Sequence, residues 1–261
     1  MQRHFAWAQQ KLRLALYPII TLSLLGSCLG SPLVPVCAQG TNSDQETGAR
    51  ESEEADSDDG WTFLFDGTSL DAFRGYAHEK IGAGWKIEDG ALVFDGKSGG
   101  GDIITRDRFA DFELRFEWKI SPGGNSGVMY RVSLGDPATY FSGPEYQILD
   151  DSAHHDGRNS ATSAAALYGL YVPQNKRLQP VGEWNTARIV VDGNRVEHWL
   201  NGEKVVQAEI GSKDWNRRVE ASKFKAWNKF GKNRQGHIAF QDHGNRVSYR
   251  NIRIRKIQHD D

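Results

Sequence analysis

The alternation of apolar and polar residues is clearest between residues 112 and 120, where the chain reads FELRFEWKI. Phe112, Leu114, Phe116, Trp118 and Ile120 fall on one face of an extended chain, and the positions between them are all charged. A period of two is typical of a half-buried antiparallel strand. We therefore predict a strand over residues 112–120 whose apolar face lies in a core.

Similar short segments recur along residues 61–257, separated by turns rich in Gly, Asn and Asp. The Asp-Gly pair in VDGNRV and the Asn-Gly pair in WLNGEKV indicate tight hairpins. Residues 214–227 are expected to form a helix or an ordered loop. Many strands, few helices and no fixed repeat predict one all-β jelly-roll sandwich of two antiparallel sheets. The further strands are expected in WTFLF, GALVF, VMYRVS, EYQIL, TARIVV, RVEHWL, EKVVQ, HIAF and YRNIRIRKI.

Strand parity then separates core residues from candidate site residues. If 112–120 pairs with 127–133 across the SPGGNSG turn, Glu117 and Arg131 share an outer face with Met129, while Val128 and Tyr130 point inward. The side chains expected inside are Phe116, Trp118, Tyr146, Ile148, Ile189, Val191, Ile238 and Phe240.

The segment GPEYQILDDSAHHDG, residues 143–157, places Glu145 and Gln147 opposite the apolar Tyr146 and Ile148. By the same parity Gln241 points outward, and His198 does so if its neighbour Trp199 is buried. If these strands share one sheet, their polar side chains converge on one outer face. The predicted cluster is Glu117, Arg131, Glu145, Gln147, His198 and Gln241.

The N-terminal segment has the pattern of an export signal. A basic start is followed by the apolar stretch LALYPIITLSLLG, which is too short to span a bilayer as a stable helix. We expect a signal peptide of residues 1–38, cleaved after VCA, or a lipoprotein signal ending at residue 27 that leaves a lipid anchor on Cys28. A retained anchor is a third alternative. Mass spectrometry of the mature N-terminus distinguishes them, and each places the domain outside the cytoplasm.

Charge changes abruptly along the chain. Residues 39–60 carry eight acids and one arginine, and they contain no aromatic residue. Such a segment cannot bury enough apolar surface to offset its ordering entropy, so we predict a disordered acidic linker. Residues 61–261 have a formal net charge of +2. Because a nucleic-acid-binding domain is usually strongly basic, no nucleic-acid partner is expected.

Several phrases in residues 61–257 resemble one family in their order and spacing. The resemblance is to the 3-keto-disaccharide hydrolase, or 3-keto-glucoside 1,2-lyase, family. The chain departs from it at LDAF, where members more often have Gly-Trp. It implies a concanavalin-A-like jelly roll, extracytoplasmic sugar breakdown and a 3-keto-glycoside substrate made by a separate oxidoreductase. The phrases are WTFLFDGTSLDAF, WKIEDGALVF, FADFELRFEWKISPGGNSGVMYR, GPEYQILDD, ALYGLY, VGEWNTARIVVDGNRVEHWLNG, SKFKAW and GHIAFQDHGNRVSYRNIRI.

The chemistry of such a substrate suggests roles for the candidate residues. A ketone at carbon 3 acidifies the carbon-2 proton, so a base, an oxyanion partner and an acid for the leaving oxygen suffice. We predict Glu145 and His198 as base and acid, in either order, and Arg131 as the oxyanion partner. The substrate-binding residues would be Glu117, Asn125, Gln147 and Gln241.

A divalent metal ion is a further hypothesis. Asp150, Asp151, His154 and His155 are candidate ligands, although their spacing matches neither an EF-hand loop nor an HExxH site. A solvated loop explains the same residues. No other cofactor is expected, since the Gly-rich segments 97–102 and 123–127 follow no phosphate-binding or dinucleotide-binding pattern.

Rival functions fit the same fold class. A carbohydrate-binding module would expose aromatic platforms, whereas the outward positions here are mostly acids, amides, Arg and His. A conventional retaining glycosidase would show closely spaced acids on one strand face, and none is present. A secreted scaffold in a sugar-degrading assembly is a third alternative.

Overall fold

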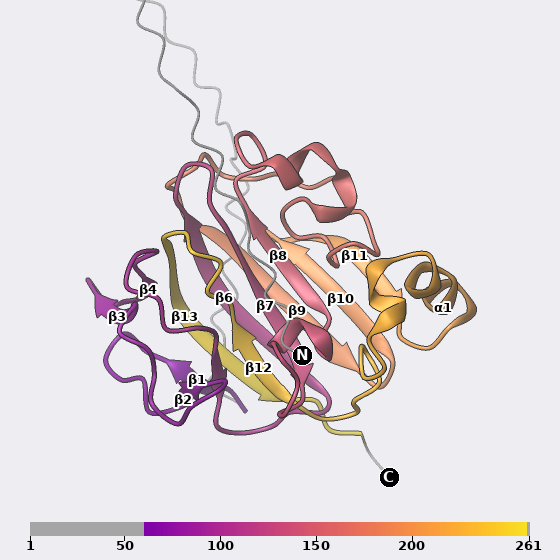
Figure 1. The fold of residues 1–261 in the computed structure, drawn as a ribbon, viewed down its shortest axis with the longest axis horizontal. Coiled ribbons are helices and arrows are strands. Elements are labelled where there is room, and N and C mark those ends of the chain that lie inside the picture. Colours follow the sequence, from indigo (N-terminus) through magenta and orange to yellow (C-terminus); the bar gives the residue numbers. More distant parts are fainter. Residues whose placement is uncertain (1–59, 260–261) are drawn as a thin grey trace, which may run out of the picture. The chain divides into compact units, whose positions relative to one another are not determined.

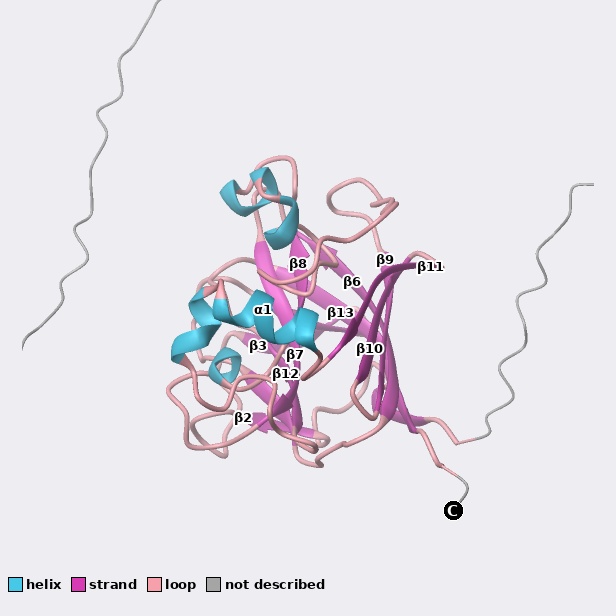
Figure 2. Cartoon of the chain, turned by 90° about the vertical axis from the view of Figure 1, so that its right-hand side faces the viewer, coloured by secondary structure: helices cyan, strands magenta, loops and turns pink. Residues whose placement is uncertain are grey.

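The computed structural model describes residues 60–259, which form a sandwich of two antiparallel sheets (Figures 1 and 2). The larger sheet has the order β11-β10-β9-β6-β13-β4-β3, with β1 also paired to β13. Its strands are β1 (Thr62–Phe65), β3 (Trp85–Glu88), β4 (Ala91–Phe94), β6 (Phe112–Ile120), β9 (Asn185–Asp192), β10 (Arg195–Leu200), β11 (Glu203–Glu209) and β13 (Val247–Lys256).

The smaller sheet has the order β2-β5-β12-β7-β8. Its strands are β2 (Phe73–Gly75), β5 (Ile103–Thr105), β7 (Asn125–Val132), β8 (Glu145–Leu149) and β12 (His237–Phe240). Helical structure is confined to α1 (Lys213–Glu220) and four short 3-10 helices within the described residues: η1 (Thr139–Phe141), η2 (His155–Arg158), η3 (Ser160–Thr162) and η4 (Lys223–Ala226). Figure 2 shows these helices on the side of the smaller sheet. No helix in residues 60–259 is long and apolar enough to cross a bilayer.

The predicted core is confirmed. All eight side chains expected inside are at most 2% exposed and belong to one hydrophobic cluster between the sheets. Every predicted strand is present, and the region around residues 214–227 contains both α1 and η4. The predicted hairpins join β9 to β10 and β10 to β11. At the second, Asn201 and Gly202 both adopt positive φ, as a two-residue hairpin turn requires.

The predicted pairing of β6 with β7 is wrong. β6 lies between β9 and β13 in the larger sheet, whereas β7 lies between β8 and β12 in the smaller one. The turn that contains Pro122 and Gly123 therefore carries the chain across the sandwich. Both strands still turn an apolar face to the core, and so their outer faces point in opposite directions.

The expected signal peptide, the lipid anchor at Cys28 and the acidic linker up to residue 59 lie outside the described residues. The predicted domain covers residues 61–257. In the structure the first strand, β1, begins at Thr62 and the last, β13, ends at Lys256.

Candidate functional site

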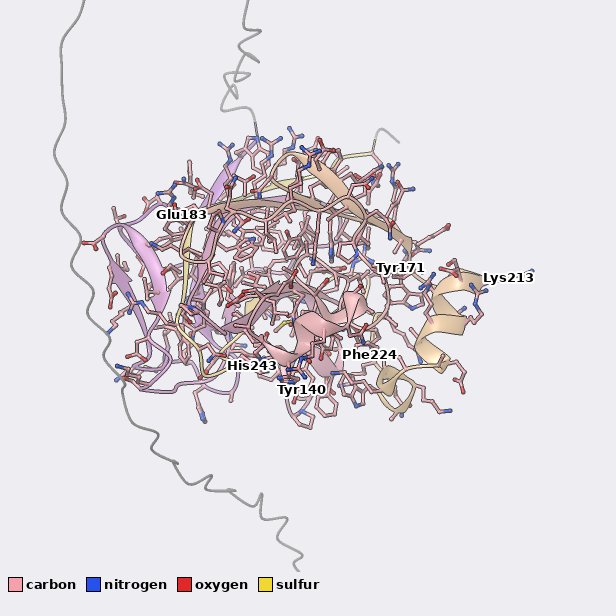
Figure 3. The ribbon with its side chains drawn as sticks, turned by 90° about the horizontal axis from the view of Figure 1, so that it is seen from above. Tyr140, Tyr171, Glu183, Lys213, Phe224 and His243 are labelled. Carbon is pink, nitrogen blue, oxygen red and sulfur yellow. The ribbon has the colours of Figure 1, made fainter. Side chains whose placement is uncertain are left out.

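A cleft lies on the outer face of the smaller sheet. Its first compartment, of about 340 Å³, is floored by β7 and β8 and bordered by η4 and by the loop after β12. Figure 3 shows Tyr140, Phe224 and His243 along one side of the molecule. The residues that line this compartment are Asn125, Tyr140, Glu145, Gln147, Tyr168, Lys223, Phe224, Trp227, Gln241 and His243.

A second compartment of about 500 Å³ adjoins the first. The two share Tyr140, Gln241 and His243, so these three residues mark the junction. Asp102 lies in the second compartment, where it accepts hydrogen bonds from the Thr139 hydroxyl and from the backbone N–H of Asp242. Burial raises the pKa of Asp102. The cleft thus has two polar compartments joined at one point.

Glu145 is the buried acid of the first compartment. Its side chain is 9% exposed, and its carboxyl group makes no hydrogen bond within residues 60–259. The side chain lies over Gly127 of the neighbouring strand, where a Cβ atom would come within 2.0 Å of Glu145 Oε1. A glycine at position 127 therefore makes the room that this carboxyl group occupies.

The surroundings of Glu145 shift its titration strongly. Burial raises its pKa to about 8, Lys223 opposes that rise, and the charges of Asp102 and Asp156 add to it. At pH 7 most of the unliganded protein therefore holds Glu145 protonated. A carboxyl group whose pKa lies near the working pH can both accept and donate a proton, which suits acid–base catalysis.

Three buried amide groups line the same compartment as this carboxyl. The side-chain oxygens of Asn125, Gln147 and Gln241 have no hydrogen-bond partner in the described structure, although the residues are at most 7% exposed. The Gln147 amide nitrogen donates to the Thr162 carbonyl at 3.1 Å, which orients its oxygen. Buried polar atoms are rarely left unpaired, so these oxygens are available to accept hydrogen bonds from water or from a ligand in the compartment. A hydroxyl-rich sugar is such a ligand.

Lys223 supplies the positive charge of the first compartment. Its ammonium group lies 4.4 Å from the centroid of the Tyr168 ring and 5.5 Å from that of Phe224. η4 positions it, and this short helix begins where the Ser222 hydroxyl accepts from the Phe224 backbone N–H. Sequence parity missed Lys223 because it belongs to no strand. The phrase SKFKAW within the family resemblance was the available signal.

The compartment brings together Glu145, Gln147 and Gln241, as sequence parity predicted, but it does not include Arg131. Asn125, which was predicted only as a substrate-binding residue, lines it too. Arg131 has a positive φ of 57° at a β-bulge, where three residue steps of β7 oppose two of β12. The bulge reverses the alternation and directs Arg131 away from the cleft. Its guanidinium donates to the Gly193 carbonyl at 2.6 Å and to Asp111 at 3.2 Å. The expectation that Arg131 faces the substrate is therefore wrong.

His198 is also outside the cleft. It points into the core, fully buried, where its ring nitrogens contact the Tyr130 hydroxyl and the Ala165 carbonyl, each at 3.2 Å. Burial lowers the pKa of His198 to about 4, which keeps it neutral at pH 7. The assumption that Trp199 is the buried neighbour was wrong, because Val196 and Leu200 share the inward parity of His198. Trp199 instead lies outside, beneath Arg188.

Glu117 lies on the opposite side of the molecule from Glu145. It points outward from the larger sheet, where Arg250 and Asn251 donate to its carboxylate. The error follows from the pairing predicted for β6 and β7. Because the two strands belong to different sheets, equal parity does not place their outward side chains on the same face.

The acidic loop after β8 divides into two parts. Asp150 accepts from the backbone N–H groups of Gly123 and Ser152, and Asp151 accepts from Lys176 and from the Ala164 backbone. Both carboxylates thus hold the loop together. This arrangement explains their position without a metal ion.

The second part of the loop lies near the cleft. Ligand atoms of His154, His155 and Asp156 lie within 4.8 Å of one another, and the His154 ring contacts that of His243 with centroids 6.2 Å apart. His154 Nδ1 already accepts from the Asp156 backbone N–H at 3.2 Å. These residue types are able to bind a divalent ion, and the metal hypothesis remains a prediction for His154 and His155.

Comparison with known proteins gives a consistent result. The profile of the 3-keto-alpha-glucoside-1,2-lyase-like domain matches residues 60–255. A Bacteroides thetaiotaomicron protein named 3-keto-disaccharide hydrolase is 38% identical, across 76% of this chain and 79% of its own. A crystal structure of a candidate glycosyl hydrolase from Parabacteroides distasonis is 34% identical with a TM-score of 0.71, across 76% and 94% of the two chains. A second structure from that organism is 25% identical with a TM-score of 0.56, across 76% and 99%.

Proposed function

Because the chain belongs to the 3-keto-alpha-glucoside-1,2-lyase-like domain family, we propose that it cleaves glycosides whose sugar carries a ketone at carbon 3. The observation that carries this proposal is the unpaired, buried carboxyl group of Glu145. It lies in one compartment with three unpaired amide oxygens and the Lys223 ammonium group. The amides would accept hydrogen bonds from sugar hydroxyls, and Glu145 would transfer protons.

The reaction that we propose is an elimination followed by hydration. Glu145 removes the proton from carbon 2, and the electron pair forms an enolate whose oxygen was the ketone at carbon 3. Collapse of the enolate expels the glycosidic oxygen from carbon 1, and this oxygen takes up a proton. Water then adds across the new carbon–carbon double bond, so that the net result is hydrolysis. A separate oxidation at carbon 3 must supply the substrate.

Lys223 takes the role that sequence reasoning had given to Arg131. A cation beside the developing enolate oxygen stabilises the transition state, most strongly where water is excluded. The aromatic rings of Tyr168, Phe224 and Trp227 line the compartment around the ammonium group. In the same way His243 replaces His198. It lies at the junction of the two compartments, where the bond to the leaving group would be, and an imidazole N–H can donate to the departing oxygen.

The proposal predicts selectivity for the oxidised sugar. The purified protein should release the aglycone from a 3-keto-glucoside and leave the unoxidised parent glucoside intact, because only the ketone makes the carbon-2 proton acidic. In deuterated water, label should enter carbon 2 of the product. If the protein binds glycans but cleaves neither sugar, it is a lectin-like module. Cleavage of the parent at a similar rate would instead indicate a conventional glycosidase.

Lys223→Met should lower the turnover of a 3-keto-glucoside by roughly 100- to 1,000-fold, as removal of an oxyanion partner does. Methionine keeps the apolar stem among the rings, so the melting temperature should change little. Lys225→Met is the matched control, since Lys225 lies on the same short helix and is also exposed, but it pairs with Glu220 and does not line the compartment. Equal turnover in the two variants would remove Lys223 from the mechanism.

A further inference from the structure

Asp102 joins the two chain segments that form the junction of the cleft. The residues that line both compartments are Tyr140, Gln241 and His243. Thr139 directly precedes the first of them, and Asp242 lies between the other two. Asp102 Oδ2 accepts from the Thr139 hydroxyl, and Asp102 Oδ1 accepts from the Asp242 backbone N–H at 2.9 Å. One carboxylate is therefore bonded next to every residue of the junction.

The carboxylates of Asp102 and Asp242 each bind the segment that carries the other. Asp242 Oδ2 accepts from the Gly101 backbone N–H at 3.0 Å, so the bonds run in both directions. This exchange lies directly beyond the pairing of β5 with β12, in which Ile103 is the partner of Phe240. The two side chains thus extend the contact between these strands into the loop after β12.

The bond from Thr139 fixes the other half of the junction. Thr139 is fully buried at the start of η1, and the residue before it, Ala138, provides no side-chain cap for this helix. Tyr140 follows and is 37% exposed, with its ring stacked on that of Phe141 at a centroid distance of 5.3 Å. An aromatic ring held in this way offers an apolar surface for a sugar ring.

A carboxylate at this position has a cost in folding free energy. Asp102 is partly buried, and no Lys, Arg or His side chain forms an ion pair with it within residues 60–259. Burial and the charge of Asp242 both raise its pKa. Burial of an unpaired charge is unfavourable, but a carboxylate can accept from two segments at once, with one oxygen for each.

We propose that Asp102 is a positioning residue that fixes the leaving-group end of the cleft. The inference rests on the proposed reaction, in which His243 donates to the departing oxygen from the junction. Without Asp102 the junction residues can shift, whereas Glu145 keeps its place on β8. Departure of a poor leaving group, such as a second sugar, should then suffer more than removal of the carbon-2 proton.

The experiment compares two 3-keto-glucosides, one whose leaving group is a second sugar and one whose leaving group is 4-nitrophenolate. Asp102→Ala should lower kcat on the first by about 10- to 100-fold, as misplacement of a reacting group does. Its kcat on the second should change by less than about threefold, because 4-nitrophenolate departs without an acid. Unreacted substrate should still exchange its carbon-2 proton with deuterated water.

Asp102→Asn should restore most of the lost turnover. The amide oxygen can accept from the Asp242 backbone N–H, while the amide N–H group donates to the Thr139 hydroxyl, which reverses its role. Thr139→Val removes the same bond from the other partner. It should shift the ratio of the two rates in the same direction as Asp102→Ala, so the test remains decisive if Asp102→Ala does not fold.

Asp95→Ala is the matched control. Asp95 also accepts from a hydroxyl and from backbone N–H groups, those of Ser98 and Lys97, but it lines neither compartment. Its substitution should leave the ratio of the two rates unchanged.

Two results would overturn the role of Asp102. One is an equal loss on both substrates in Asp102→Ala and Thr139→Val, which would show a general defect of the fold. The other is a loss in Asp102→Asn as large as that in Asp102→Ala, which would show that the charge itself acts on the substrate. If the wild type cleaves neither substrate, the proposed reaction fails, and this role fails with it.

Discussion

Glu145→Gln should lower the turnover of a 3-keto-glucoside by at least about 100-fold, since general acid–base steps typically contribute about 100- to 10,000-fold. The substitution keeps the size of the side chain and its place above Gly127 but removes its ability to move a proton. Deuterium should no longer enter carbon 2 from the solvent if Glu145 is the base. The measurement compares single-turnover rates and label incorporation in wild type and variant.

The pH dependence of the wild type follows from the same group. With a pKa of about 8, Glu145 is ionised in only a minor fraction of the protein at pH 7. If the ionised form is the base, kcat/KM should rise with pH and level off above about pH 8. This rising limb should be absent from the residual activity of Glu145→Gln. A wild-type profile that falls over the same range would instead make Glu145 the acid.

As the pH rises, the free energy of unfolding of the wild type should fall while its activity rises. The folded protein raises the pKa of Glu145 from 4.5 to about 8, so the unfolded chain releases its proton first as the pH rises. Wild type is therefore progressively destabilised between about pH 4.5 and 8, whereas the glutamine variant is not. The variant should be more stable than wild type by roughly 1–3 kcal/mol at pH 8, with a smaller difference at pH 5. Thermal melts across this pH range measure it.

Glu183→Gln is the control for the effects of Glu145→Gln on turnover and on the pH dependence of stability. Glu183 is exposed and lies away from Tyr140 and His243, as Figure 3 shows. Its substitution should alter neither turnover nor the pH dependence of stability. Near-normal turnover in Glu145→Gln would show that Glu145 is a buried structural residue and that the reaction occurs elsewhere.

Trp118→Ala should destabilise the domain by about 3–5 kcal/mol, as the loss of a large buried aromatic side chain does. Trp118 is 1% exposed and projects from β6 into the cluster between the two sheets. Little of the surrounding core can collapse into the space, because β6 is held by hydrogen bonds on both edges. Urea denaturation should show a lower midpoint with an unchanged slope.

Lys119→Ala tests the same strand on its other face. The Lys119 ammonium group lies outside, 4.7 Å from the centroid of the Trp184 ring. Its removal should cost less than about 1 kcal/mol. If the two variants had similar effects, the alternation of β6 between core and solvent would be wrong.

Local periodicity was sufficient for much of the fold and for part of the site. The alternation in FELRFEWKI and EYQIL correctly separated core from outer residues, because a regular strand sends successive side chains to opposite faces. Parity also placed Glu145, Gln147 and Gln241 on an outer face. β7, β8 and β12 belong to one sheet, so these side chains do meet in one compartment.

Parity failed where the backbone or the sheet assignment departed from a regular pattern. One extra residue in β7 turned Arg131 inward, and nothing in VMYRVS marks a bulge. His198 was misplaced because a tryptophan was assumed to be the more buried neighbour. Glu117 was misplaced because a short Gly-rich turn can either close a hairpin or cross between sheets.

The sequence by itself determined the strands, most of their inward faces and the position of Glu145 on an outer face. Each of these depends on interactions between residues close in the chain. Only the tertiary structure decided which outer face each strand joined, and that Lys223 and His243 line the same compartment as Glu145. Those two residues come from segments about 80 and 100 positions away. Burial in the folded structure, and not any local pattern, raises the pKa of Glu145.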